Sequence, residues 1–367
     1  MRVEELLRCQ IQEWYPLFKA HTFTTLFHPL PDPFLRYLRG QPMVTTQQDH
    51  QNDDDVAPPP LFLLPRSTTG RDPLPRTTSH LDPVSLLDPD LSNLSDDDED
   101  DQNAPCFPDL EAAVERSISD LGGAAFPKLN WSAPKDATWI SPDGSLRCSS
   151  FADVALLLRS SDSVSHDLSH SDGDGDGGQS DESKPNVPNV PPIYYLALRE
   201  WDPSLRPEME FRCFVRRHRL VAVSQRDVTA FYPALLDRCL EIRDAIRSFF
   251  SDVVGPRFGC EDYTFDVYYY VSKRRGRGKV KLVDFNPWGA FTLPLLFSWE
   301  ELEEDREEDG EVEFRVVESQ CGVRPGLKTA VPYDYLDTGE GSGWDQFLRR
   351  ADEELRRQAQ HPDADCS

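Results

Sequence analysis

The sequence predicts an α+β fold built from antiparallel β-hairpins and amphipathic helices and arranged in two lobes. Two pairs of strand-like segments, residues 210–215 with 219–226 and residues 264–271 with 279–285, are each separated by a polar turn. Between the pairs, residues 232–250 carry apolar side chains at helical spacing. A chain of 367 residues can bury a sizeable core shared between two subdomains.

Residues 1–39 are expected to form a small N-terminal element that docks on the main body. Residues 3–20 show helical spacing, with Pro16 expected to end the helix or nearly so. Residues 22–30 then predict a strand and residues 31–38 a short helix. This amphipathic start carries acidic residues, which fits neither a signal peptide nor a transit peptide.

Residues 40–104 and 161–190 are predicted to be disordered insertions. The first contains three consecutive prolines and the acidic block SDDDEDD, so it offers little apolar surface to offset the entropy of ordering. The second contains DGDGDGG, which lacks the spacing and the final Glu of an EF-hand and indicates a flexible linker. Residues 303–367 are expected to form an acidic C-terminal extension, with a strand at residues 312–317 and a helix near residues 345–358.

The net charge of −26 argues against nucleic acid or an anionic membrane surface as the main partner, because a surface that binds phosphates must be basic. No segment approaches the roughly 18 consecutive apolar residues of a transmembrane helix. The eight cysteines are scattered and form no C-x-x-C pair, which disfavours a zinc site or a disulfide framework. We therefore expect reduced thiols in a cytosolic or nuclear compartment, of which the cytoplasm is preferred. We also expect a monomer.

Residues 105–160 are expected to form the first lobe. A helix over residues 108–121 should end at a pair of glycines, and a strand should follow and end at Trp131. A loop and a second short strand are then expected, followed by a helix over residues 149–160 that a serine caps.

Two lysines of this lobe, Lys128 and Lys135, follow the glycine pair. Lysine beside glycine-rich backbone is a common way to hold a phosphate. The Walker A pattern is absent, however, so two ordinary surface lysines are the simpler alternative.

Residues 191–302 are expected to form the second lobe, which begins with a strongly apolar strand over residues 192–200. Its predicted strands contain embedded polar residues, and buried charges must be paired or used. The alternative is a strand with one face in water. These positions are Arg199, Glu210, Arg212, Gln225 and Arg226.

The second hairpin of this lobe carries a candidate metal site. If its turn centres near Arg275, Asp266 faces Asp284, and Asn286 points to the same side as Asp284. Opposed residues place their Cβ atoms roughly 4.5–5.5 Å apart, and two carboxylates at that distance repel unless a proton or a cation separates them. Three oxygen ligands suit Mg²⁺. The alternative is a solvated strand face followed by an Asn-Pro turn.

The order of these motifs resembles the cell division cycle protein 123 family. The resemblance rests on RCQIQEWYPLF, FPKLNWSAPKDATWI, LREW, EFRCFV, SQRD and VDFNPWG, and it covers most of the chain outside the two insertions and much of the tail. The insertions are similar in length and composition to those of a plant member. The resemblance implies an ATP-grasp-like fold that binds ATP and Mg²⁺ between two lobes. It also implies an assembly chaperone that binds the gamma subunit of eukaryotic translation initiation factor 2 and promotes formation of its heterotrimer.

The resemblance further implies roles for individual residues, with no catalytic residue among them. One departure from the family's pattern is Lys135, which stands where an Arg is common, and the two differ in bidentate phosphate contacts. The implied roles are phosphate contacts by Lys128 and Lys135, with Asn130 and the backbone near Ala133 in the same loop; an adenine-side hinge of Arg199, Glu200 and Trp201; a ribose and phosphate side of Glu210, Arg212 and Asp227; and Mg²⁺ ligation by Asp266, Asp284 and Asn286.

Two other functions stay open at this point. An ATP-dependent carboxylate–amine ligase is the commonest chemistry of this fold type, but it needs a second substrate pocket and an acyl-phosphate intermediate. A structural module that binds no nucleotide is the other possibility, since fold does not settle function.

Overall fold

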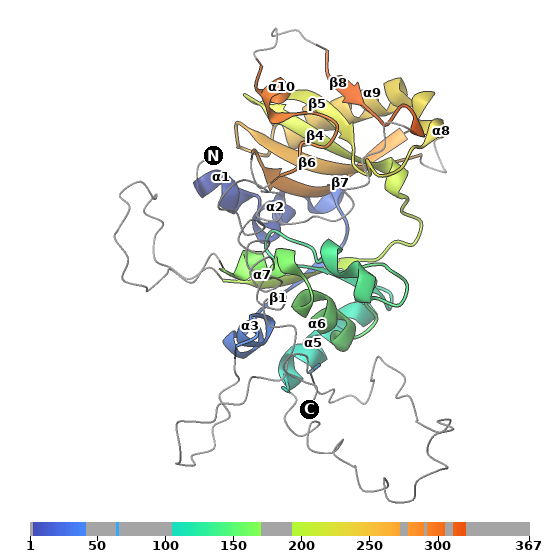
Figure 1. Cartoon of the computed structure of the whole chain (residues 1–367). Helices are drawn as coiled ribbons and strands as arrows, with labels where there is room; N and C mark the ends of the chain where they lie inside the picture. The colour runs from blue at the N-terminus through green and yellow to red at the C-terminus, as the bar shows by residue number, and fades with distance from the viewer. Residues whose placement is uncertain are drawn as a thin grey trace, which may run out of the picture. The chain divides into compact units, whose positions relative to one another are not determined.

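The computed structural model describes the chain in seven stretches, and the described part is α+β, as predicted (Figure 1). It divides into two compact units, which are described separately. The N-terminal unit comprises residues 2–206 and 280–285, and the C-terminal unit comprises residues 207–279 and those from 286 onward. The described stretches are residues 3–41, 64–65, 105–169, 193–271, 278–289, 292–304 and 311–320.

The N-terminal unit is built on a three-stranded antiparallel sheet in the order β1-β3-β2. β1 spans Thr25–Pro29, β2 spans Ala125–Lys128 and β3 spans Tyr195–Glu200. The central strand β3 buries Leu196 and Leu198 in a core that helices share. These helices are α3 (Asp32–Leu38), α5 (Pro108–Asp120), α6 (Phe151–Arg159) and α7 (Asp162–Ser169).

The predicted N-terminal helix is two helices, α1 (Val3–Arg8) and α2 (Ile11–Phe18), followed by the 3-10 turn η1 (Lys19–His21). The break lies at Gln10, whose backbone is extended, because Asn130 O takes the N–H of Ile11 at 2.8 Å. Pro16 lies inside α2, and the helix ends soon after it, at Phe18, as predicted.

The strand β7 (Gly278–Pro287) contributes its residues 280–285 to the N-terminal unit. Phe285 is buried against the rings of Trp14 and Phe18, at centroid distances of 5.6 and 5.2 Å. Thr22 Oγ1 donates to the carbonyl of Leu282 at 2.8 Å. The first helices of the chain therefore hold this part of β7 in place.

The C-terminal unit is built on a five-stranded sheet in the order β7-β6-β4-β5-β8. The first predicted hairpin is confirmed as β4 (Glu210–Arg216) and β5 (Arg219–Gln225). Its turn residues Arg217 and His218 both have positive φ, 50° and 60°, as a tight type I′ turn requires. β6 (Tyr263–Val271) pairs antiparallel with β4, and the short β8 (Glu313–Arg315) lies parallel to β5.

The predicted helix over residues 232–250 is interrupted. It consists of α8 (Pro233–Leu236), α9 (Cys239–Phe249) and the π-helical turn η6 (Phe250–Val254). At the interruption Arg238 has φ −114° and ψ 0°, and its guanidinium lies 5.3 Å from the centroid of the Tyr269 ring. The remaining elements are η5 (Pro207–Met209) and α10 (Trp299–Glu303), which Ser298 caps.

Two sequence predictions in the N-terminal unit are wrong. Residues 135–140 form the 3-10 helix η4 (Lys135–Ile140) and no second strand, because the chain turns after Pro134 and closes i→i+3 hydrogen bonds. The segment predicted as a disordered linker begins with α7, in which Val164 and Leu168 are buried and Ser161 Oγ accepts from the N–H of Val164 at 3.2 Å.

Other predictions fall outside the described residues, namely the helix near residues 345–358 and nearly all of the insertion at residues 40–104. Among the helices that the structure does describe, none is long and apolar enough to cross a membrane.

Candidate functional site

The residues that the sequence singled out divide between the two units, and each set is described within its own unit. In the N-terminal unit, Lys128 ends β2 and is 1% exposed. Its Nζ lies 2.8 Å from Asp284 Oδ2 and also donates to the carbonyl of Trp131. Lys128 is therefore no surface lysine: it is a buried cation held between a carboxylate and a backbone carbonyl.

Asn130 is fully buried and joins three segments of the N-terminal unit. Its Nδ2 donates to Gln10 Oε1 at 2.8 Å and to the carbonyl of Ile193 at 3.0 Å. Its Oδ1 accepts from the N–H of Tyr195 at 2.8 Å. Both amide hydrogens and the amide oxygen are thus used inside the protein, so Asn130 shapes the loop that follows β2.

Lys135 lies at the start of η4 and is exposed. Its backbone N–H donates to the carbonyl of Ala133 at 2.7 Å. The two predicted phosphate lysines are therefore in different environments. Lys128 is fixed, whereas the amine of Lys135 is accessible to solvent.

Arg199 lies in β3, is 1% exposed and is surrounded by aromatic rings. Its guanidinium carbon is 5.8, 5.4 and 5.2 Å from the ring centroids of Trp14, Phe23 and Phe126. Its Nη2 donates to Thr22 Oγ1 at 3.1 Å. Such contacts suit a guanidinium, which is planar and stacks on aromatic faces.

The other two residues of the predicted hinge are Glu200, which is the last residue of β3, and Trp201, which follows it. Glu200 donates its N–H to the carbonyl of Thr24 at 2.8 Å, and its carboxylate accepts from the N–H of Thr24 at 3.4 Å. Trp201 lies edge-on to Phe126, with ring centroids 6.5 Å apart. Both residues are half-buried, at the end of the central strand of this sheet.

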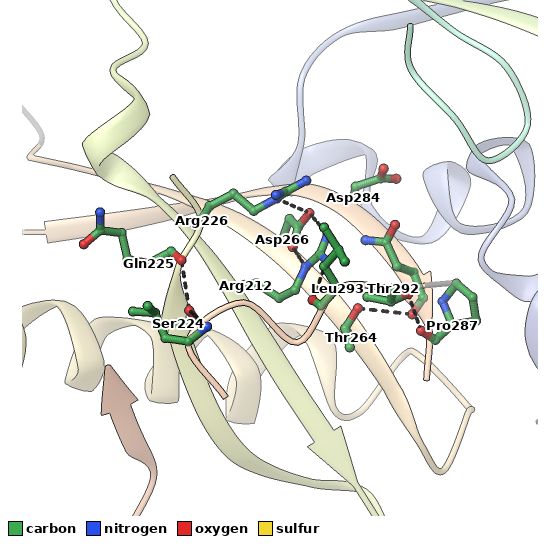
Figure 2. Close-up of polar contacts among 12 residues, drawn as sticks. Arg212, Ser224, Gln225, Arg226, Thr264, Asp266, Asp284, Pro287, Thr292 and Leu293 are labelled. Atoms are coloured by element: carbon green, nitrogen blue, oxygen red, sulfur yellow. Dashed lines mark hydrogen bonds and ion pairs between the residues drawn. The ribbon is translucent and has the colours of Figure 1, made fainter. Parts of the chain in front are cut away.

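In the C-terminal unit, Asp266 of β6 is opposite Arg212 of β4 in the strand register. The Nε and Nη2 of Arg212 donate to the two carboxylate oxygens of Asp266 at 2.8 and 2.9 Å, with both side chains at most 6% exposed. Arg226 Nε adds a contact to Oδ2 at 3.3 Å (Figure 2). Asp266 therefore has two guanidinium groups against it.

Arg226 completes a cluster in which cations stand close together. Its side chain is 25% exposed, and burial together with the neighbouring Arg212 lowers its pKa, while Asp266 and Glu210 raise it. Glu210 is half-buried and its carbonyl accepts from the N–H of Arg226 at 3.0 Å. Two arginines and two carboxylates therefore meet in this cluster, and their charges offset one another.

Asp227 organises the loop after β5. Its Oδ1 accepts from the N–H of Thr229 at 3.0 Å, and its Oδ2 accepts from the hydroxyl of Tyr232 at 2.6 Å. Burial and this carboxylate raise the pKa of Tyr232. The side chain of Asp227 thus shapes its own loop.

Asp284 and Asn286 are two residues apart in β7 and so lie on the same face of the strand. In each residue one polar atom, Asp284 Oδ1 and Asn286 Nδ2, is buried without a hydrogen-bond partner among the described residues. The two atoms of an amide are assigned from their surroundings, so the oxygen of Asn286 could occupy the same place as its nitrogen. Carboxylate and amide oxygens are both ligand types that suit a hard cation.

The fit to Mg²⁺ therefore differs among its three predicted ligands. Asp284 Oδ1 and one amide atom of Asn286 are buried without a partner among the described residues, although Asp284 Oδ2 is paired with Lys128. Both oxygens of Asp266 are already paired with arginines. In the part of the chain that the structure describes, no three His, Cys, Asp or Glu side chains gather as a metal site. Mg²⁺ here would depend on few protein ligands plus phosphate oxygens, which is its usual coordination with nucleotides.

Two charged residues that contact this part of the protein, Arg226 and Asp167, were not among the predicted site residues. Asp167 accepts a hydrogen bond from the N–H of Ser132, in the loop after Lys128. Arg226 was recognised in the sequence as an embedded charge, but its pairing with Asp266 needs the strand register. Asp167 lies in α7, inside a segment that its composition marked as a linker. The apolar spacing of Val164 and Leu168 was the signal that could have revealed this helix.

The family model described as D123 matches residues 14–339. A Xenopus tropicalis protein named "Translation initiation factor eIF2 assembly protein" is 33% identical over 387 residues, which cover 100% of both chains. A Danio rerio protein of the same name is 35% identical over 361 residues, covering 93% of this chain and 91% of that protein.

A Phaeosphaeria nodorum protein named "Cell division cycle protein 123" is 37% identical over 292 residues, covering 78% of this chain and 66% of that protein. Among solved structures, "Structure of Cdc123 from Schizosaccharomyces pombe" is similar with a TM-score of 0.59 and 30% identity. That similarity covers 87% of this chain and 99% of the solved one.

Proposed function

The chain belongs to the D123 family, and from this premise we propose that it is an ATP-binding assembly chaperone for eukaryotic translation initiation factor 2. In this proposal it binds the gamma subunit, promotes formation of the heterotrimer and acts in the cytoplasm. The observation that carries the proposal is full-length similarity to relatives that are named eIF2 assembly proteins. The ATP-grasp-like character of the fold is part of the same proposal.

The proposed ligand is ATP with Mg²⁺, which would supply a charged phosphate chain and a hard cation. Lys128 would hold phosphate oxygens by its buried ammonium group, and Lys135, an exposed residue, would add a second cation. Asp284 and Asn286 would supply oxygen ligands to Mg²⁺. Arg212, together with Glu210 and Asp227, would form the ribose and phosphate side, with the Arg212 guanidinium oriented by Asp266.

Lys128 and Asp284 would act together in this proposal. The ion pair at 2.8 Å orients both side chains, of which Lys128 is 2% and Asp284 is 17% exposed. A bound phosphate would replace Asp284 as the negative partner of Lys128, and a bound cation would replace Lys128 as the positive partner of Asp284. Neither side chain would then be left as an unpaired buried charge.

The partner would be recognised in part through charge. The chain carries a net charge of −26, which favours encounter with a protein that has basic patches and raises the association rate at low salt. Binding of the gamma subunit should therefore weaken as the ionic strength rises.

Calorimetric titration tests the nucleotide part of the proposal. We expect ATP to bind wild-type protein in the presence of Mg²⁺, and Asp284→Ala to weaken binding by about tenfold or more, the effect of losing one charged ligand. The matched control is Asp244→Ala, whose carboxylate is 68% exposed on α9. Equal affinities in all three proteins would remove Asp284 from the site, and no binding to wild-type protein would refute the nucleotide proposal.

Binding of purified subunits tests the partner part. We expect the chain to form a complex with the isolated gamma subunit on size-exclusion chromatography and to leave the isolated alpha and beta subunits unbound. A complex with alpha or beta alone, and none with gamma, would contradict the assignment of the partner.

A further inference from the structure

The peptide group between Trp131 and Ser132 is held at both of its ends. Its carbonyl accepts a hydrogen bond from Lys128 Nζ. Its N–H, which belongs to Ser132, donates to Asp167 Oδ2 at 2.9 Å, and Ser132 Oγ donates to Asp167 Oδ1 at 2.9 Å. One carboxylate in α7 is thus connected through a single peptide group to the buried lysine of β2.

The carboxylate of Asp167 is itself fixed. Asp167 is 8% exposed and its carbonyl accepts from the hydroxyl of Tyr194 at 2.9 Å. Its neighbours Val164 and Leu168 are buried in the core of the N-terminal unit. The backbone that carries the carboxylate is therefore held in place, and the two hydrogen bonds from Ser132 orient the carboxylate itself.

A buried carboxylate is costly, and this one has a specific set of partners. Burial raises the pKa of Asp167 to about 6, against the opposing effects of the Ser132 hydrogen bonds and the charge of Lys128, which lower it. The carboxylate is charged at neutral pH, and its two oxygens accept hydrogen bonds from Ser132 in the loop that follows Lys128.

We propose that Asp167 is a positioning residue for Lys128: it orients the Trp131–Ser132 peptide so that the carbonyl holds the Lys128 ammonium against Asp284. The chain of contacts runs from Asp167 to the peptide N–H, from the peptide carbonyl to Lys128 Nζ, and from Nζ to Asp284 Oδ2 at 2.8 Å. A peptide group that is hydrogen-bonded at its N–H is a stronger and better oriented acceptor at its carbonyl. The consequence for nucleotide affinity rests on the proposed function, whereas the positioning of Lys128 does not.

Labelling of amines tests the positioning directly. The folded full-length protein is treated with a limiting amount of an acylating reagent, and mass spectrometry measures the labelling rate of Lys128 relative to that of exposed Lys135. The variants are Asp167→Ala, which removes the acceptor, and Asp167→Asn, which keeps an oxygen for the Ser132 N–H. The matched control is Asp136→Asn, because Asp136 holds the same helix through Ser161 Oγ at 2.7 Å and does not contact the peptide.

We expect the relative labelling rate of Lys128 to rise about tenfold in Asp167→Ala and about threefold in Asp167→Asn, as the loss or weakening of one charge-assisted hydrogen bond implies. Asp136→Asn should leave it unchanged. An unchanged rate in both Asp167 variants would overturn the proposal, and so would an equal rise in the Asp136 control, which would mean general loosening of α7. If circular dichroism shows that Asp167→Ala does not fold, Asp167→Asn is compared with Asp136→Asn. The proposal then fails if the relative labelling rate of Lys128 is unchanged in Asp167→Asn or rises equally in both variants.

Titration with Mg·ATP forms the second arm. If wild-type protein binds, we expect the affinity to fall about tenfold in Asp167→Ala and to stay unchanged in Asp136→Asn. Unchanged affinity in Asp167→Ala would overturn the link to the nucleotide. Failure of wild-type protein to bind would refute the proposed nucleotide function, and the labelling arm would still decide whether Asp167 positions Lys128.

Discussion

Replacing Asp266 by Ala removes the carboxylate on which two arginines converge. Arg212 donates two hydrogen bonds to it at 2.8 and 2.9 Å, and Arg226 adds a third contact at 3.3 Å. Neither Asp266 nor Arg212 has a side chain more than 6% exposed. The substitution therefore leaves two guanidinium groups close together in a largely buried place, without the carboxylate that offsets their charge.

The expected loss of unfolding free energy is large. Removing one partner of a buried ion pair costs about 3–5 kcal/mol, because the other charge stays buried. The exposed pair of Arg243 with Asp244 gives the scale for comparison: its atoms are 3.6 Å apart and Asp244 is 68% exposed, so Asp244→Ala should cost less than about 1 kcal/mol.

Urea unfolding followed by tryptophan fluorescence measures both variants, in Mg²⁺ and again in EDTA. If Asp266 acts through its arginines, the loss in Asp266→Ala is the same in both buffers. If it is a metal ligand in the absence of nucleotide, Mg²⁺ stabilises wild-type protein and not the variant. A loss below about 1 kcal/mol in both buffers would refute the energetic argument, because removing a buried carboxylate that accepts two hydrogen bonds from an arginine should cost more than that.

Three further predictions concern packing and pH. A Cβ added at Gly278 would lie 2.2 Å from Tyr269 Oη, so Gly278→Ala should lower stability by about 1–3 kcal/mol, and adding Tyr269→Ala should cost less than the sum of the two single changes in thermal unfolding. Asn130→Ala removes a buried amide with three hydrogen bonds and should cost about 2–4 kcal/mol in urea unfolding. Because the pKa of Asp167 is raised to about 6, the folded protein keeps a proton that the unfolded chain releases at lower pH, so this group's contribution to stability falls as pH rises toward neutrality. The stability of wild-type protein minus that of Asp167→Asn should therefore fall by about 1.5 kcal/mol between pH 5 and pH 7.5.

Each of these predictions has an outcome that would contradict it. Additive losses at Gly278 and Tyr269 would mean that the two residues do not meet. A loss below about 0.5 kcal/mol in Asn130→Ala would mean that its hydrogen bonds do not hold the loop. A stability difference that rises with pH, or stays constant, would mean that Asp167 is not destabilised by burial of its charge.

The sequence predicted the elements that local chemistry decides. Alternating apolar residues identified the β4–β5 hairpin, and the structure adds a tight turn with positive φ at Arg217 and His218. Ser150 caps α6 by accepting from the N–H of Asp153 at 3.1 Å, as the sequence predicted for a serine at this helix start. The helices over residues 31–38 and 108–121 were also confirmed within two residues.

The errors share a physical cause, which is contact with residues distant in the sequence. The first helix breaks because Asn130, far along the chain, takes the N–H of Ile11. The start of the second insertion is helical because two of its residues are buried in the core, although its composition is polar. The hydrogen bond to Ile11 has no local signal in the sequence, whereas the spacing of Val164 and Leu168 was a weak local signal for α7.

The candidate site was predictable in its residue types but not in its pairings. The embedded charges of EFR, SQRD and VDFN were recognised, yet the sequence could not say which cation meets which carboxylate. Register between strands decides that Arg212 meets Asp266, and the packing of β7 on the N-terminal helices decides that Lys128 meets Asp284. Whether these groups also bind Mg·ATP stays a prediction.

The rate of heterotrimer formation tests the central claim most directly. Purified alpha, beta and gamma subunits of eukaryotic translation initiation factor 2 are mixed with and without this protein, and the assembled trimer is measured over time by native mass spectrometry. The account predicts faster assembly or a higher yield with wild-type protein and Mg·ATP, and a smaller effect with Asp284→Ala. Assembly that proceeds equally in the presence and absence of the wild-type protein would contradict it.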